Sequence, residues 1–172
     1  MKIFLIGLPG SGKTTLGKQL AKKLKLPFID LDTEIEKIQG QTISEIFESK
    51  KENHFREIES NLLKKFCLLF ESFVMATGGG APCFHDTMRA MNQSGTTIFL
   101  DVPSKEIADR LMKTNLSDRP LLAKMNDEAL KDKIEFLRSQ RIIFYRQAHL
   151  VFQNPAVSVE DMIPKIKGYN PQ

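Results

Sequence analysis

A glycine-rich loop near the start of the chain constrains the fold more than any other feature. The loop reads GLPGSGKT, from Gly7 to Thr14, and it follows the short apolar run Lys2–Ile6. After it, Leu16, Leu20 and Leu24 lie on one helical face. The pattern G-x-x-x-x-G-K-[ST] between a strand and a helix is typical of a loop that binds nucleotide phosphates. Glycines let the backbone close around phosphate oxygens, and the helix start adds a positive dipole end.

The side chains of this loop suit phosphoryl transfer. Lys13 would reach the β- and γ-phosphates as a point charge, and the Thr14 hydroxyl would be a ligand of Mg²⁺. A glycine turn that merely joins a strand to a helix would need neither side chain. We expect ATP to contact consecutive residues of the loop, namely Gly10, Ser11, Gly12, Lys13, Thr14 and Thr15.

Short apolar runs recur along the chain and alternate with helical segments, which predicts an α/β fold with a mostly parallel sheet covered on both faces. The predicted strands are Lys2–Ile6, Pro27–Leu31, Phe73–Ala76, Thr97–Val102 and His149–Gln153. Capping boxes at Thr42–Glu45 and Ser158–Asp161 predict helix starts, and Glu52–Phe70 carries helical periodicity. Residues 113–124 combine Asn, Ser, Asp and Pro without apolar periodicity, which predicts a mobile loop that could serve as a lid.

Composition narrows the class of protein. The 172 residues suit one domain, and the net charge of +4 permits an acidic ligand without requiring nucleic acid. No apolar run approaches the length of a membrane span. Cys67 and Cys83 form no CxxC pair, which favours a reducing compartment over a disulfide scaffold. We expect a soluble, cytoplasmic monomer that binds neither nucleic acid nor membrane.

Two further features lie where predicted strands end. Asp30 and Asp32 close the second strand at the carboxyl edge of the sheet, and a period of two would point both to one side. One could hold Mg²⁺ through water and the other could contact an alcohol, unless Asp32 only caps a helix. Three glycines, Gly78 to Gly80, follow the third strand, which indicates that the backbone approaches another group closely there.

A phosphate loop alone does not separate a kinase from a GTPase or a motor protein. The chain has no NKxD-like guanine motif, which counts against a GTPase. Asp101 ends the fourth strand and offers an alternative metal-binding aspartate. The isolated His54, His85 and His149 favour surface or packing roles.

Five short motifs together resemble the shikimate kinase family over residues 1 to about 153. They are GLPGSGKTT, the D-x-D of Asp30 and Asp32, the FRxxE of Phe55–Glu59, the TGGG of Thr77–Gly80 and the RPLL of Arg119–Leu122. The resemblance implies one three-layer P-loop kinase domain, 1–172, whose five-stranded parallel sheet has the order 2-3-1-4-5. It also implies a helical substrate-binding insertion at about 33–70 and a lid at about 113–124.

The activity implied is transfer of the ATP γ-phosphate to the 3-hydroxyl of shikimate, which gives shikimate 3-phosphate and ADP. This is the fifth step of chorismate and aromatic amino acid biosynthesis. By position, the residues implied to bind shikimate are Asp32, Arg56, Gly78, Gly79, Gly80 and Arg141. Asp30 would lie near Mg²⁺ and Arg119 would reach ATP from the lid, so that Lys13, Asp32 and Arg119 are the implied catalytic residues.

Some alternatives stay open at this point. Arg141 is matched to the substrate-binding arginine of the family's R-x-P-x-Y segment through its spacing from Tyr145. Ile143 stands where the family usually has proline, so Arg138 and Arg146 remain alternatives for binding the substrate carboxylate. Contacts to adenine are not assigned. The rival functions are another P-loop kinase, for gluconate or a nucleoside monophosphate, and a binding module that holds ATP as a switch. The D-x-D and the arginine-rich acceptor side count against the switch.

Overall fold

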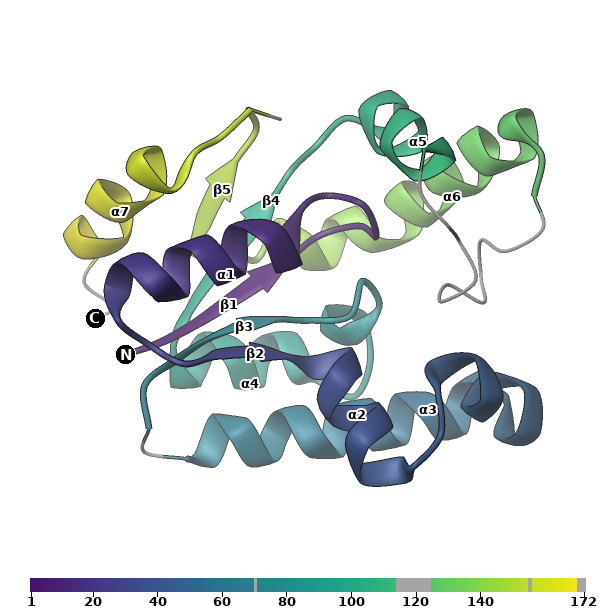
Figure 1. The fold of residues 1–172 in the computed structure, drawn as a ribbon, viewed down its shortest axis with the longest axis horizontal. Helices are drawn as coiled ribbons and strands as arrows, with labels where there is room; N and C mark the ends of the chain where they lie inside the picture. Colours follow the sequence, from purple (N-terminus) through teal and green to yellow (C-terminus); the bar gives the residue numbers. More distant parts are fainter. Residues whose placement is uncertain (70, 114–124, 155, 170–172) are drawn as a thin grey trace.

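The central element of the fold is a five-stranded parallel sheet in the order β2-β3-β1-β4-β5 (Figure 1). The structure is a computed structural model that describes residues 1–69, 71–113, 125–154 and 156–169. Of Lys50 it describes only the backbone. The strands are β1 (Lys2–Ile6), β2 (Phe28–Asp30), β3 (Phe73–Ala76), β4 (Thr96–Leu100) and β5 (Leu150–Phe152). The predicted α/β class and strand order are confirmed.

Helices cover both faces of the sheet because successive strand residues point to opposite sides. On one face, Ile3 and Leu5 of β1 pack with α1 (Lys13–Leu24) and α7 (Val159–Gly168). On the other face, Phe4 and Ile6 belong to the core that also contains the remaining α-helices. These are α2 (Leu31–Gln39), α3 (Ile43–Leu68), α4 (Thr87–Ser94), α5 (Ser104–Met112) and α6 (Asp127–Tyr145). Among the described residues, no helix is long and apolar enough to cross a membrane.

The chain turns directly from β2 into α2, which corrects one step of the sequence analysis. The strand was expected to continue to Leu31, but it ends at Asp30 and Leu31 already begins the helix. The prediction that a period of two orients Asp30 and Asp32 is therefore wrong, because these residues belong to different elements. Leu31 is fully buried, and its packing against the core favours the early start of the helix.

Both predicted capping boxes are present. Thr42 and Glu45 cap α3, and Ser158 and Asp161 cap α7, each with reciprocal side-chain and backbone hydrogen bonds. Helix α3 consists of two helical stretches that meet at Lys51, which has φ 66° and ψ 166°. Helix α5 ends at Met112, and residues 114–124 of the predicted lid lie outside the described residues.

We predict that Lys51→Gly stabilises the protein by about 1 kcal/mol, because its backbone conformation is open almost only to glycine. Urea denaturation monitored by circular dichroism measures this change. The matched control is Lys65→Gly, on the same helix but with ordinary helical geometry, which should destabilise by roughly 0.5–1 kcal/mol. Equal destabilisation by both substitutions would contradict the argument.

Candidate active site

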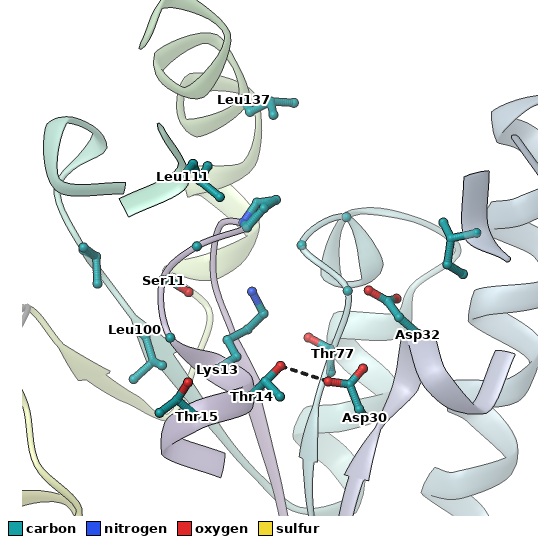
Figure 2. A pocket seen from close by; sticks show the side chains of 18 of the residues that line it. Ser11, Lys13, Thr14, Thr15, Asp30, Asp32, Thr77, Leu100, Leu111 and Leu137 are labelled. Carbon is teal, nitrogen blue, oxygen red and sulfur yellow. Dashed lines mark hydrogen bonds between the residues drawn. The ribbon is translucent and has the colours of Figure 1, made fainter. Parts of the chain in front are cut away.

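A cleft of about 1030 Å³ opens at the carboxyl edge of the sheet (Figure 2). Open parallel sheets bind their ligands at this edge. The glycine-rich loop and α1 form one wall, and α2, α3 and the loop after β3 form the other. The cleft brings together every predicted site residue that the structure describes, namely Gly10, Ser11, Gly12, Lys13, Thr14, Thr15, Asp30, Asp32, Arg56, Gly78, Gly79, Gly80 and Arg141. Arg119 lies outside the described residues.

The glycine-rich loop curls over the start of α1. Gly10 and Gly12 have φ values of 84° and 95°, which L side chains rarely adopt. The Lys13 ammonium is buried and donates to the carbonyl oxygens of Gly7, at 3.0 Å, and Leu8, at 2.9 Å. A positive charge thus lies beside the glycine-rich loop where α1 begins, an arrangement that suits a bound phosphate chain.

Asp30 contacts the glycine-rich loop and does not cap α2. It occupies the N-cap position of α2, yet its side chain makes no capping hydrogen bond and instead accepts one from the Thr14 hydroxyl at 2.9 Å (Figure 2). A hydroxyl oxygen and a carboxylate therefore meet beside the phosphate loop. Both are hard oxygen donors of the kind that Mg²⁺ prefers, so the residues present fit this ion.

Asp32 lies in the first turn of α2 and its carboxylate lines the cleft (Figure 2). The alternative that it caps the helix is wrong, since the N-cap position belongs to Asp30. Burial raises the pKa of Asp32 to about 6, and the charge of Asp30 adds to this rise, whereas Lys13 and Arg56 lower the pKa. With this pKa the carboxylate is mostly ionised at neutral pH but is easily protonated. This suits a group that accepts a hydrogen bond, and then a proton, from an alcohol.

The three glycines after β3 allow close approach, as expected, and each faces a different group. A Cβ on Gly78 would lie 2.4 Å from Glu59 Oε1 and 3.0 Å from Asp32 Oδ1. A Cβ on Gly79 would lie 2.8 Å from Pro9 Cδ, and one on Gly80 would lie 2.5 Å from the guanidinium of Arg56. None of the three has a positive φ, so the need for glycine here is steric.

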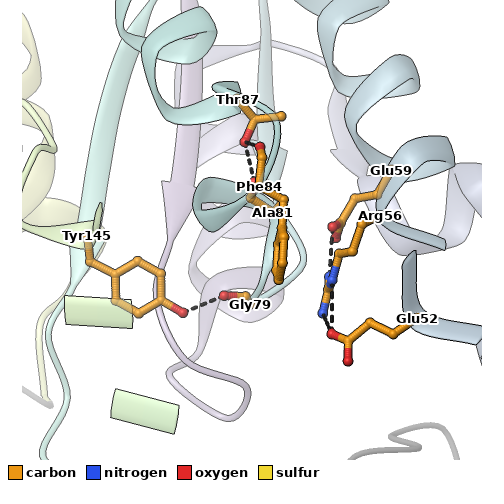
Figure 3. Close-up of polar contacts among 8 residues, drawn as sticks. All are labelled: Glu52, Arg56, Glu59, Gly79, Ala81, Phe84, Thr87 and Tyr145. Atoms are coloured by element: carbon orange, nitrogen blue, oxygen red, sulfur yellow. Dashed lines mark hydrogen bonds and ion pairs between the residues drawn. The ribbon is translucent and has the colours of Figure 1, made fainter. Parts of the chain in front are cut away.

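Arg56 is buried on α3, with 4% of its surface exposed, and is held by two carboxylates (Figure 3). Its Nη1 donates to Glu59 Oε2 at 2.7 Å, and its Nη2 and Nε donate to Glu52 Oε1 at 2.9 Å and 3.2 Å. These contacts use three of the five N–H groups of the guanidinium. The other two N–H groups suit a third carboxylate, that of a ligand that enters the cleft.

Glu59 is a site residue to which the sequence analysis gave no role, although it closes the FRxxE motif. It is 1% exposed, and among the described side chains its Oε1 has no hydrogen-bond partner. Burial raises the pKa of Glu59 to about 7, against the lowering effect of Arg56. Its i, i+3 spacing from Arg56 was the available signal, because residues so spaced meet on one helical face.

Arg141 is the α6 arginine that faces the cleft. It is buried, and its guanidinium would lie 3.2 Å from a Cβ on Gly79. Arg138 instead pairs with Asp101 at 2.6 Å, and Arg146 is exposed at the end of the helix. The sequence held a signal for this choice, because Arg141 continues at helical spacing the buried stripe of Leu130, Ile134 and Leu137.

Tyr145, one turn after Arg141, is fully buried and its hydroxyl donates to the carbonyl oxygen of Gly79 (Figure 3). The carbonyl group of the middle glycine is thus fixed from α6.

Two residues that the sequence analysis left without a catalytic role have structural partners. Asp101 forms an ion pair with Arg138, and His149 Nδ1 accepts a hydrogen bond from the backbone of Thr97 at 3.3 Å.

The end of the cleft beyond the phosphate loop is lined by residues that the sequence analysis did not assign. Arg110 of α5 forms an ion pair with Glu106 at 3.0 Å and approaches Gly12. The other lining residues here are Leu100, Val102, Phe152, Asn154 and Val157. No local motif marks Arg110, because the loop that it faces lies far away in the sequence.

Comparisons with known proteins agree with this geometry. A family model described as shikimate kinase matches residues 9–167. A shikimate kinase of Bacteroides fragilis is 47% identical over 152 residues, which are 88% of this chain and 84% of the relative. A shikimate kinase of Parabacteroides distasonis is 42% identical over 167 residues, which are 97% of this chain and 95% of the relative.

Solved structures of shikimate kinases superpose on most of the chain. The enzyme from Bacteroides thetaiotaomicron has a TM-score of 0.88 at 39% identity and covers 97% of this chain and 96% of its own. The enzyme from Acinetobacter baumannii, in complex with shikimate, has a TM-score of 0.85 at 34% identity and covers 96% and 90%. The fold, the cleft and these relatives lead to one conclusion: the chain belongs to the shikimate kinase family.

Proposed function

We propose that the protein transfers the γ-phosphate of ATP to the 3-hydroxyl of shikimate, with ADP and shikimate 3-phosphate as products. The observation that carries this proposal is a single cleft in which a phosphate loop faces a carboxylate, Asp32, and two buried arginines, Arg56 and Arg141. The relative from Acinetobacter baumannii, whose structure contains shikimate, supports the choice of acceptor.

The acceptor end of the cleft suits a small carboxylated triol. Arg56 and Arg141 would bind its carboxylate, because a planar guanidinium can donate two parallel hydrogen bonds to such a group. The backbone of Gly78–Gly80 would lie against the ring of the triol, since side chains there would collide with the surrounding residues. Asp32 would accept a hydrogen bond from the attacking hydroxyl.

The donor end would hold ATP. Residues 10–15 would bind its phosphates, with Lys13 exchanging its present carbonyl partners for phosphate oxygens. Thr14 would hold Mg²⁺ directly and Asp30 through water, and when bound this ion would neutralise charge on the β- and γ-phosphates. Arg110 is suited to the nucleotide side of the cleft, and Arg119 remains our proposal for a residue that reaches ATP from the lid.

Asp32 would act chiefly by orienting the nucleophile. Phosphoryl transfer passes through a loose transition state with little bonding to the nucleophile, so that the hydroxyl need not be deprotonated early. The carboxylate would align the hydroxyl with the γ-phosphate and receive its proton as the new P–O bond forms.

The organisation around this reaction is also a proposal. Residues 1–172 would form one domain, with the substrate-binding insertion at about 33–70 and the lid at about 113–124. The two free cysteines support a reducing compartment, for which we propose the cytoplasm. We propose a monomer that acts on small molecules, with neither nucleic acid nor membrane as a partner.

We expect ADP release that depends on shikimate and is absent with gluconate or nucleoside monophosphates. A coupled assay of ADP formation measures this. Lys13→Ala should lower kcat by about 10²-fold or more, because the ammonium stabilises charge that develops in the transition state. Turnover of ATP without any acceptor, or only with one of the other acceptors, would rule out the proposed substrate.

Arg56→Ala and Arg141→Ala should each weaken shikimate binding by about 1.5–3 kcal/mol and leave ATP affinity nearly unchanged. Lysine at either position should restore little, since it cannot form the planar pair of hydrogen bonds. Isothermal titration with each substrate measures both affinities. Arg138→Ala is the matched control on α6 and should not affect shikimate binding, because Arg138 pairs with Asp101 outside the cleft.

The pH dependence should report the raised pKa of Asp32. Because the ionised carboxylate accepts the hydroxyl hydrogen, kcat/KM for shikimate should rise as pH increases through about 6. Asp32→Asn should lower kcat by about 10²–10⁴-fold and abolish this acidic limb. A limb that persists unchanged in Asp32→Asn would assign the titration to another group.

A further inference from the structure

Phe84 covers the guanidinium of Arg56 from outside the cleft. Its ring centroid is 4.8 Å from Arg56 Cζ, compared with 5.1 Å for Phe55 and 6.0 Å for Phe47. Phe84 does not line the cleft, and 37% of its surface is exposed. Figure 3 shows its side chain descending from the loop after β3 to lie beside Arg56. We propose that Phe84 is a positioning residue that fixes the orientation of Arg56 for the carboxylate of the acceptor, an inference that rests on the proposed function.

Phe84 differs from the other two rings in where it comes from. Phe55 directly precedes Arg56 on α3, and Phe47 lies on the same helix before the break at Lys51, so both rings come from the element that carries Arg56. Phe84 follows the short 3₁₀ helix Ala81–Cys83, directly after the three glycines. The ring therefore connects the loop that would contact the acceptor with the arginine that would bind its carboxylate.

The backbone around Phe84 is built to hold this ring in place. The buried Thr87 hydroxyl donates to the carbonyl oxygens of Ala81 and Phe84, the latter at 2.8 Å, and the Thr87 amide donates to Phe84 O at 3.2 Å. His85 and Asp86 then both adopt left-handed conformations, with φ 52° and 57°. Two consecutive non-glycine residues in this region are energetically costly.

Helix capping does not account for this costly turn. Asp86 occupies the N-cap position of α4, but its side chain makes no capping hydrogen bond. The turn lies directly after Phe84, whose ring packs on Arg56 of α3. Backbone strain that persists in a folded protein tends to lie beside functional sites.

The ring supplies a constraint that the two carboxylates cannot. Glu52 and Glu59 bind the edges of the guanidinium, which leaves its plane able to tilt about the line that joins them. A π face packed on the cation restricts this tilt, because the attraction is strongest when the cation lies over the face of the ring. The N–H groups that remain would then keep a fixed direction toward the cleft.

The kinetic test compares Phe84→Leu, Phe84→Met and Phe84→Tyr with the wild type. The Leu and Met variants keep apolar volume without a π face, and should raise KM for shikimate about 3- to 30-fold while KM for ATP and kcat change less than about twofold. The Tyr variant keeps the ring and should behave like the wild type. Phe136→Leu is the matched control, because Phe136 is an exposed phenylalanine, 55% accessible, that lies over Lys133 away from the cleft.

A second measurement does not depend on activity. The Arg56 Nε–H resonance in ¹H–¹⁵N spectra should shift and exchange faster with solvent in Phe84→Leu and Phe84→Met, but not in Phe84→Tyr or Phe136→Leu. Melting temperatures show that each variant is folded. If the wild type lacks shikimate-dependent turnover, the proposed function fails, and the resonance alone then decides the role of Phe84. The inference is overturned if the Arg56 resonance is unchanged in Phe84→Leu and Phe84→Met. It is also overturned if Phe84→Leu, Phe84→Met and Phe84→Tyr all change KM for shikimate equally.

Discussion

The close approach of the Gly78–Gly80 backbone to its surroundings is the constraint on which the site depends. This loop lies against the glycine-rich loop through Pro9, against α3 through Arg56 and Glu59, and against α6 through Arg141 and Tyr145. Elements from widely separated parts of the chain are thereby fixed relative to one backbone segment. Since a single Cβ at any of the three glycines would come within 3 Å of another atom, the spacing of the whole acceptor side depends on their small size.

Charge is the second organising factor. Arg56 and Glu59 are both buried, and an ion pair removed from water gains little net stability, because desolvation offsets the attraction. The arrangement is better explained by orientation. Glu52 and Glu59 hold the guanidinium at its edges and aromatic rings cover its faces, so the remaining N–H groups are directed before any substrate arrives. Preorganisation of this kind reduces the entropic cost of binding, because the side chain is already ordered.

The two carboxylates near the reacting centre have different environments and thus different tasks. Asp30 lies beside the Thr14 hydroxyl at the phosphate loop, whereas Asp32 is set back in the wall of the cleft, where burial raises its pKa. The sequence analysis assigned one aspartate to the metal and the other to the alcohol, but it derived their shared direction from a strand that in fact ends between them. The two side chains still line one cleft, because α2 begins directly after β2 and Asp32 lies in its first turn.

The sequence by itself determined the features that arise from local chemistry. The order of glycines, lysine and threonine specifies the phosphate loop, the alternation of apolar runs and helical segments specifies a parallel sheet, and Thr42 and Ser158 specify two helix starts. These features depend on neighbours within a few residues. Only the tertiary structure decided that Phe84 covers Arg56 and that the Tyr145 hydroxyl donates to the carbonyl oxygen of Gly79. These contacts join α3, α6 and the loop after β3, whose mutual distances follow from how whole elements pack on the sheet.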